Sequence, residues 1–277
     1  MYTHGMQVGR TKVTVGAWSP DDAKRCKLSS WSLRALQIQE DIFKHHALAN
    51  GVRAAIDSIG AQRAYAPSVA TANAAVVSSA ELENRIPLGK SIVLYRNKDV
   101  PADGVFLEPG EAFVMSGAGC PVIIAIAGEH MIVAHAGRDS LIERNAVIGK
   151  PSRKRVSIVY AMIEALAKRG ATPEDINMCM QFSIPTEMFE HSPDHPIHGA
   201  YNRSLATLAD ALWHGCIVRK NGSVFLDMES LFVEQAREVG IRCVWAMNSL
   251  AEFPTLAHTR DDKDPSRRNL FVVKRNA

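Results

Sequence analysis

Residues 109–139 read PGEAFVMSGAGCPVIIAIAGEHMIVAHAGRD, and the arrangement of the rest of the chain follows from this stretch. Two short apolar runs, residues 122–127 and 131–134, are rich in β-branched side chains and bounded by glycines, a pattern typical of buried strands. The Gly-Glu-His turn between them predicts a hairpin. Because a hairpin folds back on itself, we expect Cys120 at its start and His135 at its end to lie close in space.

Cys120 and His135 are a candidate catalytic pair. Cysteine attacks as the thiolate, and histidine titrates in the range that lets it accept the thiol proton. Gly117 and Gly119 leave backbone N–H groups near Cys120 that could receive a developing oxyanion. The alternative is structural, because a cysteine beside an apolar strand is most often a small buried hydrophobe.

A catalytic histidine normally needs a further polar group that orients its ring. Asp103, Ser116 and Asp139 are the candidates, and the sequence does not rank them. Arg138, which precedes Asp139, is expected at the rim of a substrate site.

Three histidines lie in the loop EHSPDHPIHG: His191, His195 and His198. The prolines predict a rigid, exposed loop. The spacing of the histidines, together with neighbouring carboxylates, could suit a metal ion. A role at the rim of the substrate site is the other interpretation, and our prediction is a site without a metal or another cofactor.

The composition bounds the class of protein. The chain has 277 residues, of which 47% are hydrophobic and 22% charged, with a net charge of +3. This is typical of a soluble globular protein and gives little reason to expect a specific nucleic-acid partner. No apolar run approaches the ~20 residues that span a bilayer, and the N-terminus does not resemble a signal peptide. We expect a cytoplasmic protein, or an effector that is exported without a classical signal peptide.

The five cysteines stand at positions 26, 120, 179, 216 and 243, without a CxxC pair or a disulfide framework. This pattern indicates folding in a reducing compartment. Cys179 and Cys243 each fall in an apolar run that predicts a strand, so both are expected to be buried.

Strand and helix patterns alternate along the chain. They predict one α+β domain over residues 1–277, with mixed sheets and outer helices. We expect an edge strand over 6–15, helices over 29–48 and 52–59 separated by Gly51, and a small-residue loop or packing surface over 61–79. Further strands are expected over 92–95, 104–107, 178–183, 243–247 and 270–274, and helices over 151–169, 205–212 and 231–238. Residues 139–149 are expected to form a loop and turn.

The central stretch resembles a known family. Residues 120–127 (CPVIIAIA) and 135–137 (HAG), with 100–110 (VPADGVFLEPG) before them and 170–190 (GATPEDINMCMQFSIPTEMFE) after, are similar to the bacterial laccase-like polyphenol oxidases, also described as purine nucleoside phosphorylases. The resemblance covers about residues 90–275, with 1–89 as an N-terminal portion of the same domain. It implies a mixed α+β fold.

The resemblance also implies a zinc site that uses the Cys, the His and a further upstream His. Counting back from Ala102 and Asp103 places Leu88 at the upstream His, so the zinc ligation is expected to be altered. The Cys and His are also similar to those of the cytotoxic necrotizing factor domain, which deamidates glutamine in small GTPases. Residues 116–120 (SGAGC) resemble its Ser-Gly-Cys motif.

Three functions follow, in order of preference. The first is a Cys/His hydrolase, an amidohydrolase or glutamine deamidase that acts through a thioester on a protein or small-molecule amide. The second is a nucleoside-processing enzyme with altered zinc ligation. The third is a relative without catalytic activity that binds a partner. The substrate and the oligomeric state are not specified by these patterns.

Overall fold

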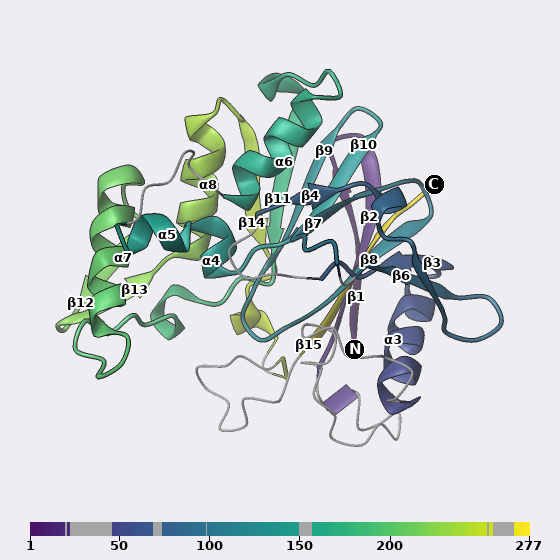
Figure 1. Ribbon diagram of the computed structural model, residues 1–277, viewed down its shortest axis with the longest axis horizontal. Coiled ribbons are helices and arrows are strands. Elements are labelled where there is room, and N and C mark those ends of the chain that lie inside the picture. The colour runs from purple at the N-terminus through teal and green to yellow at the C-terminus, as the bar shows by residue number, and fades with distance from the viewer. Residues whose placement is uncertain are drawn as a thin grey trace.

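Two β-sheets that pack face to face form the centre of the protein (Figure 1). The computed structural model describes residues 1–19, 21–22, 46–68, 74–97, 99–149, 157–253, 255–256 and 269–277. Within these residues, one sheet has seven strands in the order β1-β2-β15-β8-β3-β6-β5, and we call it the first sheet. The second sheet has six described strands in the order β14-β11-β9-β10-β7-β4.

The strands of the first sheet are β1 (Tyr2–Val8), β2 (Thr11–Trp18), β15 (Asn269–Arg275), β8 (Glu111–Gly117), β3 (Arg63–Tyr65), β6 (Val93–Arg96) and β5 (Asn84–Pro87). Those of the second sheet are β14 (Cys243–Met247), β11 (Ile176–Gln181), β9 (Val122–Ala127), β10 (His130–His135), β7 (Gly104–Leu107) and β4 (Val76–Val77). The α-helices are α3 (His46–Ser58), α4 (Arg138–Leu141), α5 (Arg144–Val147), α6 (Ile158–Ala167), α7 (Gly199–Leu212) and α8 (Met228–Glu238). Short 3-10 turns lie at Ser79–Glu81, Pro173–Asp175, Thr186–Met188 and Leu250–Glu252.

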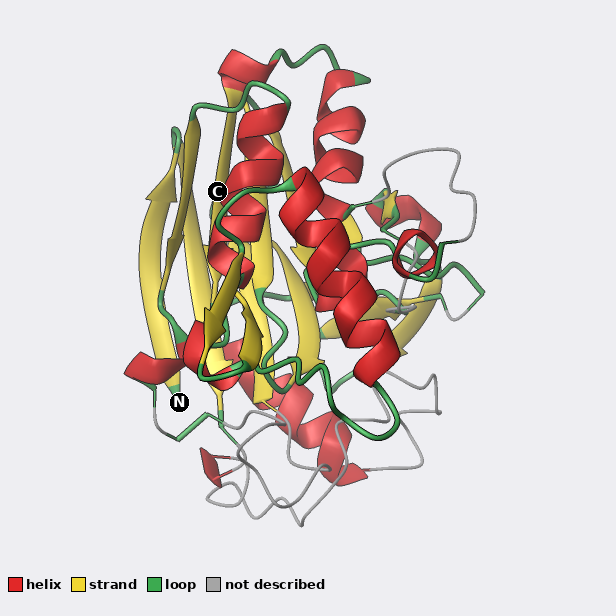
Figure 2. Ribbon diagram, turned by 90° about the vertical axis from the view of Figure 1, so that its left-hand side faces the viewer, coloured by secondary structure: helices red, strands yellow, loops and turns green. Residues whose placement is uncertain are grey.

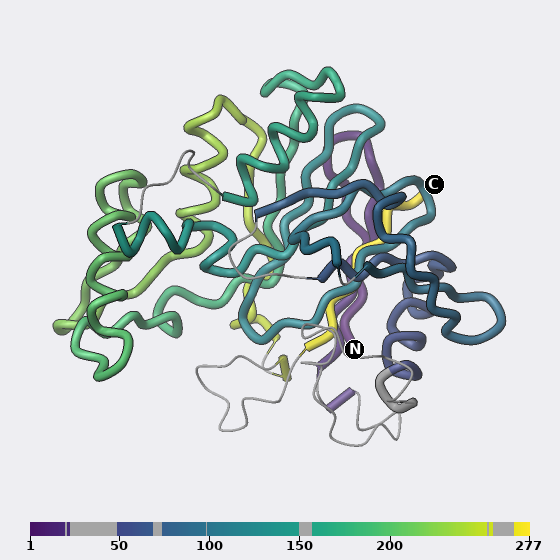
Figure 3. The backbone as a smooth tube through the Cα atoms, in the orientation of Figure 1, coloured from purple at the N-terminus to yellow at the C-terminus, as the bar shows by residue number. Residues whose placement is uncertain are grey.

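The ends of the chain meet in the first sheet. Strand β15 pairs with β2 on one side and with β8 on the other, so the C-terminal strand lies beside the N-terminal hairpin (Figure 3). The edge strand expected over 6–15 is in fact two strands, because Gly9 and Arg10 make a tight turn between β1 and β2. Gly9 has φ +58°, which glycine adopts without steric cost. Strand β1 does form the edge of this sheet.

The predicted hairpin is present in the second sheet. Strand β9 pairs with β10 from Val122 to Ala127, and the turn falls at residues 128–129. Every residue of β9 is buried. A run of six apolar residues suits this position because both faces of the sheet are covered, one by the first sheet and the other by helices.

Helices cover the outer faces of both sheets. Helices α6 and α8 pack on the second sheet, and α3 packs on the far face of the first (Figure 1). Figure 2 shows the strands side by side, with most of the helices on one side of them. Helix α6 buries one stripe that includes Val159, Met162 and Leu166. The α+β class with mixed sheets and outer helices is confirmed.

A buried hydrogen-bonded chain ties three helices together. The Ser157 hydroxyl caps α6 and donates to the Gln235 side chain of α8 at 2.6 Å. The Gln235 amide in turn donates to the Leu141 carbonyl at the end of α4, at 2.8 Å. Because α4 follows β10 directly, these bonds hold the segment that comes after His135.

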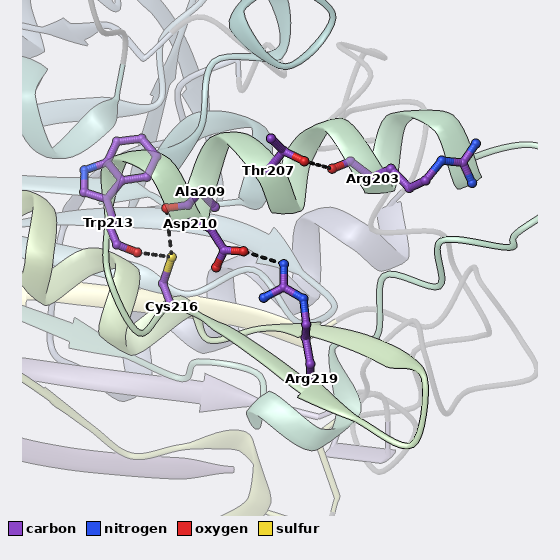
Figure 4. Close-up of polar contacts among 7 residues, drawn as sticks. All are labelled: Arg203, Thr207, Ala209, Asp210, Trp213, Cys216 and Arg219. Carbon is purple, nitrogen blue, oxygen red and sulfur yellow. Dashed lines mark hydrogen bonds and ion pairs between the residues drawn. The ribbon is translucent and has the colours of Figure 1, made fainter.

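Helix α7 packs against a separate hairpin of β12 (Ile217–Lys220) and β13 (Ser223–Leu226), neither of which was predicted from the sequence. Asp210 of α7 forms an ion pair with Arg219 of β12 (Figure 4). The Cys216 thiol, just before β12, donates to the Trp213 carbonyl at 3.0 Å. Asn221 and Gly222 both have positive φ at the turn, so the Asn-Gly pair was an available hairpin signal.

Four other local predictions were wrong or incomplete. Gly51 does not separate two helices but lies inside α3. Residues 139–149 include the short helices α4 and α5 instead of a loop alone, and residues 61–79 include strands β3 and β4. Strand β8 was not predicted, because glycines follow its apolar part. The helix expected over 29–48 lies mostly outside the described residues, as do the first residues of the helix expected over 151–169.

No helix in the described ranges is long and apolar enough to cross a membrane.

Candidate active site

The register of the second sheet places His135 beside Asp103. Ala134 pairs with Gly104 in β7, so the next residue, His135, lies opposite Asp103, and its backbone N–H donates to the Asp103 carbonyl at 2.8 Å. Residues that lie opposite each other in a sheet project to the same face. The two side chains therefore meet, and His135 Nδ1 lies 3.0 Å from Asp103 Oδ1.

Asp103 is the one of the three candidate orienting residues that lies within hydrogen-bond distance of the His135 ring. It is fully buried, and its carboxylate fixes the orientation of the imidazole and places the Nδ1 proton. Asp139 instead accepts hydrogen bonds from Arg138 and from the Tyr201 hydroxyl. Ser116 lies in β8, opposite Leu270 of the first sheet.

Ser140 was not predicted as a site residue. Its hydroxyl lies 3.4 Å from His135 Nδ1, and the side chain is buried. It reaches the ring because α4 turns back directly after β10. A polar residue five positions after the histidine was the only signal of this contact in the sequence.

Cys120 lies in the connection between β8 and β9, where the chain passes from the first sheet to the second. Gly119 has φ +108°, which allows the chain to bend before the cysteine. Gly117 is the last residue of β8, and a side chain there would meet Phe271 Cε2 at 3.2 Å and the Cys120 carbonyl at 3.3 Å. Both glycines therefore let the backbone around Cys120 turn and pack closely; their role toward an oxyanion stays a prediction.

The Cys120 and His135 side chains meet above the backbone of Gly137. A methyl group on Gly137 would lie 3.0 Å from His135 Nε2 and 3.3 Å from Cys120 Sγ. Because Nδ1 faces Asp103, it is Nε2 that faces the sulfur. The structure thus brings Cys120, His135 and Asp103 together in that order.

His135 is held in its charged form. Burial of the ring disfavours the imidazolium, but hydrogen bonds with Asp103 and Cys120 and the negative charges of both outweigh it and raise the pKa of His135 to about 10. An imidazolium beside a sulfur generally favours the thiolate, so a reactive thiolate at Cys120 stays a prediction.

The other cysteines differ in environment. Cys179 and Cys216 are buried, and burial is the main cause that raises the pKa of each thiol to about 12. Cys243 is exposed, contrary to the prediction, because β14 is the edge strand of the second sheet. Cys26 lies outside the described residues.

Arg138, which follows Gly137, lines a pocket of about 820 Å³ together with His195 and His198, whereas Cys120 and His135 are not among the lining residues. These three residues of the predicted rim are therefore brought together. His191 differs: it is 2% exposed and packs edge-on against the Phe189 ring, so it lies below the surface of the loop that was expected to be exposed.

Of the three zinc ligands that the family resemblance implies, Cys120 and His135 lie together, but the third position is Leu88. Leu88 is 3% exposed and belongs to the apolar cluster between α3 and the first sheet. Within the described part of the chain, no group of three or more His, Cys, Asp or Glu side chains could hold a metal ion. The donor set near Cys120 thus does not fit zinc, which prefers three or four ligands.

The packing above Gly137 leads to a prediction. Gly137 has φ −66°, so alanine suits its backbone, but the added methyl group would lie 2.9 Å from His135 Cε1. We expect Gly137→Ala to displace the imidazole and slow alkylation of Cys120 several-fold, measured by mass spectrometry of labelled peptides. Gly5→Ala is the control, because nothing lies within 4 Å of its added methyl group. An unchanged rate in Gly137→Ala would contradict the arrangement described above.

Comparisons with known proteins support the fold. No family model and no curated protein matches the sequence. A Neisseria meningitidis protein of family DUF152 has a similar structure, with a TM-score of 0.61, 15% identity and coverage of 99% of each chain.

Two further solved structures are similar. YlmD from Geobacillus stearothermophilus has a TM-score of 0.61 at 13% identity, and the hypothetical protein YfiH from Bacillus licheniformis has 0.58 at 14%. Each comparison covers 96% of this chain and 92% of the other. These neighbours have the polyphenol oxidase-like fold. The resemblance to the polyphenol oxidases is therefore confirmed at the level of fold. The likeness to cytotoxic necrotizing factor stays a prediction.

Proposed function

We propose that this protein is a Cys/His-dependent amidohydrolase that converts a carboxamide to a carboxylate and ammonia, as a glutamine deamidase does. One observation carries the proposal: His135 interacts through its ring with both Asp103 and Cys120. A nucleophile, a base and a residue that orients the base are the three parts that such chemistry requires.

In the first half-reaction, the Cys120 thiolate attacks the carbonyl carbon of the amide. A C–S bond forms, and the carbonyl oxygen takes up the electron pair as an oxyanion. Backbone N–H groups between Gly117 and Cys120 are our candidates for its stabilisation. As the C–N bond breaks, the imidazolium of His135 gives its Nε2 proton to the nitrogen, which leaves as ammonia, and a thioester remains.

In the second half-reaction, water attacks the thioester. Neutral His135 accepts a proton from the water, the C–S bond breaks, and the acid is released with Cys120 again as the thiolate. Asp103 keeps the Nδ1 proton in place throughout, so that Nε2 alone exchanges protons with the substrate. The net reaction consumes one water and one amide.

The reactivity of Cys120 tests this proposal. At pH 6 we expect iodoacetamide to label Cys120 first, ahead of the exposed Cys243, because a neighbouring imidazolium favours its thiolate. The pKa of His135 near 10 sets the sign of the pH dependence. Below that pH the imidazolium persists, so the advantage of Cys120 over Cys243 should be largest at pH 6 and should shrink above about pH 8.5, where an ordinary thiol also becomes a thiolate. Peptide mass spectrometry measures both rates, and equal rates at pH 6 would rule out the hydrolase.

A second function is favoured by one observation, the polyphenol oxidase-like fold of the structural neighbours. A nucleoside-processing enzyme of the laccase-like family is therefore the alternative proposal. The described residues around Cys120 do not form a group of three or more side chains that could hold a metal ion, which argues against it. Release of a free purine base from nucleosides and phosphate, in protein supplied with zinc, would favour this alternative over the amidohydrolase. Binding of a partner without catalysis is the proposal that remains if neither activity is found.

A further inference from the structure

The pocket that Arg138 lines is rich in hydrogen-bond donors and positive charge, and it reaches toward the site through Arg138, since Cys120 is not among its lining residues. Arg138 and Arg144 contribute guanidinium groups to it, and His195, Tyr201 and Asn202 are further lining residues. A volume of about 820 Å³ is sufficient for a small organic substrate or for one side chain of a larger one. Its chemistry therefore indicates which kind of amide could approach the thiolate.

Arg138 connects the pocket to the nucleophile. It follows Gly137 in the chain. Burial lowers the pKa of Arg138, but the hydrogen bond with Asp139 and nearby negative charges, that of Cys120 among them, raise it by more. Its Nε donates to Asp139 at 2.7 Å, and its guanidinium lies 4.9 Å from the centre of the Tyr201 ring. These two contacts hold the side chain in place. Its two Nη groups make no hydrogen bond to any described residue, so they are available to a ligand.

His195 adds a donor of known direction. Its Nδ1 accepts hydrogen bonds from the backbone N–H groups of Ile197 and His198, at 3.2 and 3.0 Å. The proton of the neutral ring must therefore be on Nε2, so this nitrogen is a donor. The ring of His198 stacks on that of His195, with centroids 4.8 Å apart. The loop thus presents a fixed donor at the pocket in which Arg138 and Arg144 lie.

The lining residues include one carboxylate, that of Glu190. Its Oε1 already accepts a hydrogen bond from the Ser223 hydroxyl at 2.7 Å. Asp139 neutralises part of the charge of Arg138, whereas exposed Arg144 has no ion-pair partner among the described residues. The pocket therefore offers more donors and positive charge than acceptors, which suits an oxyanion such as a carboxylate.

We propose that this pocket binds a carboxylate of the substrate, so that the amides hydrolysed at Cys120 are those that also carry an acidic group. This inference rests on the proposed function, because it assigns the substrate class of the same site. Arg138 and Arg144 would hold the carboxylate while the carboxamide lies against Cys120. They act as specificity-determining residues. Removing either should slow the reaction of Cys120 with a reagent that carries a carboxylate more than its reaction with a neutral reagent.

Two alkylating reagents of similar size test the inference on the intact protein. Iodoacetate carries a carboxylate and iodoacetamide does not, and both alkylate a thiolate with loss of iodide. We expect the ratio of the iodoacetate rate to the iodoacetamide rate to be at least about tenfold higher at Cys120 than at Cys243 or at free N-acetylcysteine. Arg138→Gln and Arg144→Gln should each lower this ratio. Arg169→Gln, which lies in a different pocket, is the control that should leave it unchanged.

Each outcome decides between the two proposals. A raised ratio that falls in the Arg138→Gln and Arg144→Gln variants supports the carboxylate pocket. A reactive Cys120 with the same ratio as the reference thiols overturns the carboxylate pocket and leaves the amidohydrolase in place. A raised ratio that both variants retain shows that the preference comes from the His135 imidazolium alone and overturns the assignment to the pocket. A Cys120 that reacts with neither reagent overturns both proposals.

Discussion

Replacing His135 with alanine is expected to slow the alkylation of Cys120 at pH 6 by about tenfold or more, since loss of one pKa unit of thiolate stabilisation corresponds to a factor of ten. In the native protein the imidazolium lies against the sulfur, and Asp103 keeps it charged. Without the ring, Cys120 must ionise unassisted in a partly buried position. Rates are measured by mass spectrometry of the labelled peptides after brief exposure to iodoacetamide.

The matched control for this variant is His130→Ala. His130 lies at the other end of the same strand, β10, where its Nδ1 is 3.3 Å from an Arg169 nitrogen. We expect its removal to leave the labelling of Cys120 unchanged. If His135→Ala and His130→Ala label at the same rate as the unsubstituted protein, the imidazole does not activate the thiol and the cysteine-hydrolase proposal is wrong.

Replacing Phe271 with alanine is expected to lower the free energy of unfolding by about 3–5 kcal/mol, the usual cost of removing a large buried aromatic side chain. Phe271 is fully buried in β15, between the two sheets. Its ring stacks on that of Phe182, with centroids 4.9 Å apart, and also lies under Gly117. The cavity would therefore open beneath the segment that carries Cys120.

Urea unfolding, followed by fluorescence and by circular dichroism, measures this loss where the two transitions coincide. Phe271→Leu keeps most of the apolar volume and should cost much less. Phe189→Ala, at a half-buried position, is a second comparison with a smaller expected loss. A loss below about 1 kcal/mol for Phe271→Ala would show that the two sheets do not depend on this contact.

Local patterns were sufficient for much of the second sheet. The run at residues 122–127 and the strands at 104–107 and 243–247 were predicted with their observed bounds, because each is a short apolar run between residues that break strands. Strand β8 was missed because glycines follow its apolar part. Gly51 was misread for the opposite reason: Val52, Ala55 and Ile56 pack against the first sheet, and this burial outweighs the low helix propensity of one glycine.

The sequence by itself determined that Cys120 and His135 would meet, because both lie at the ends of segments joined by one tight hairpin. Only the tertiary structure decided which of the three candidate residues contacts the histidine ring. Asp103 lies 32 positions earlier in the chain and reaches the ring through the pairing of β7 with β10. Arg138 and His195 were both predicted at the rim of the site, but only the fold brings Arg138 of α4 into one pocket with His195 and Tyr201, which lie much later in the chain. Short-range patterns encode turns and strands, whereas the order of strands in a sheet depends on packing over the whole chain and is not written in any one segment.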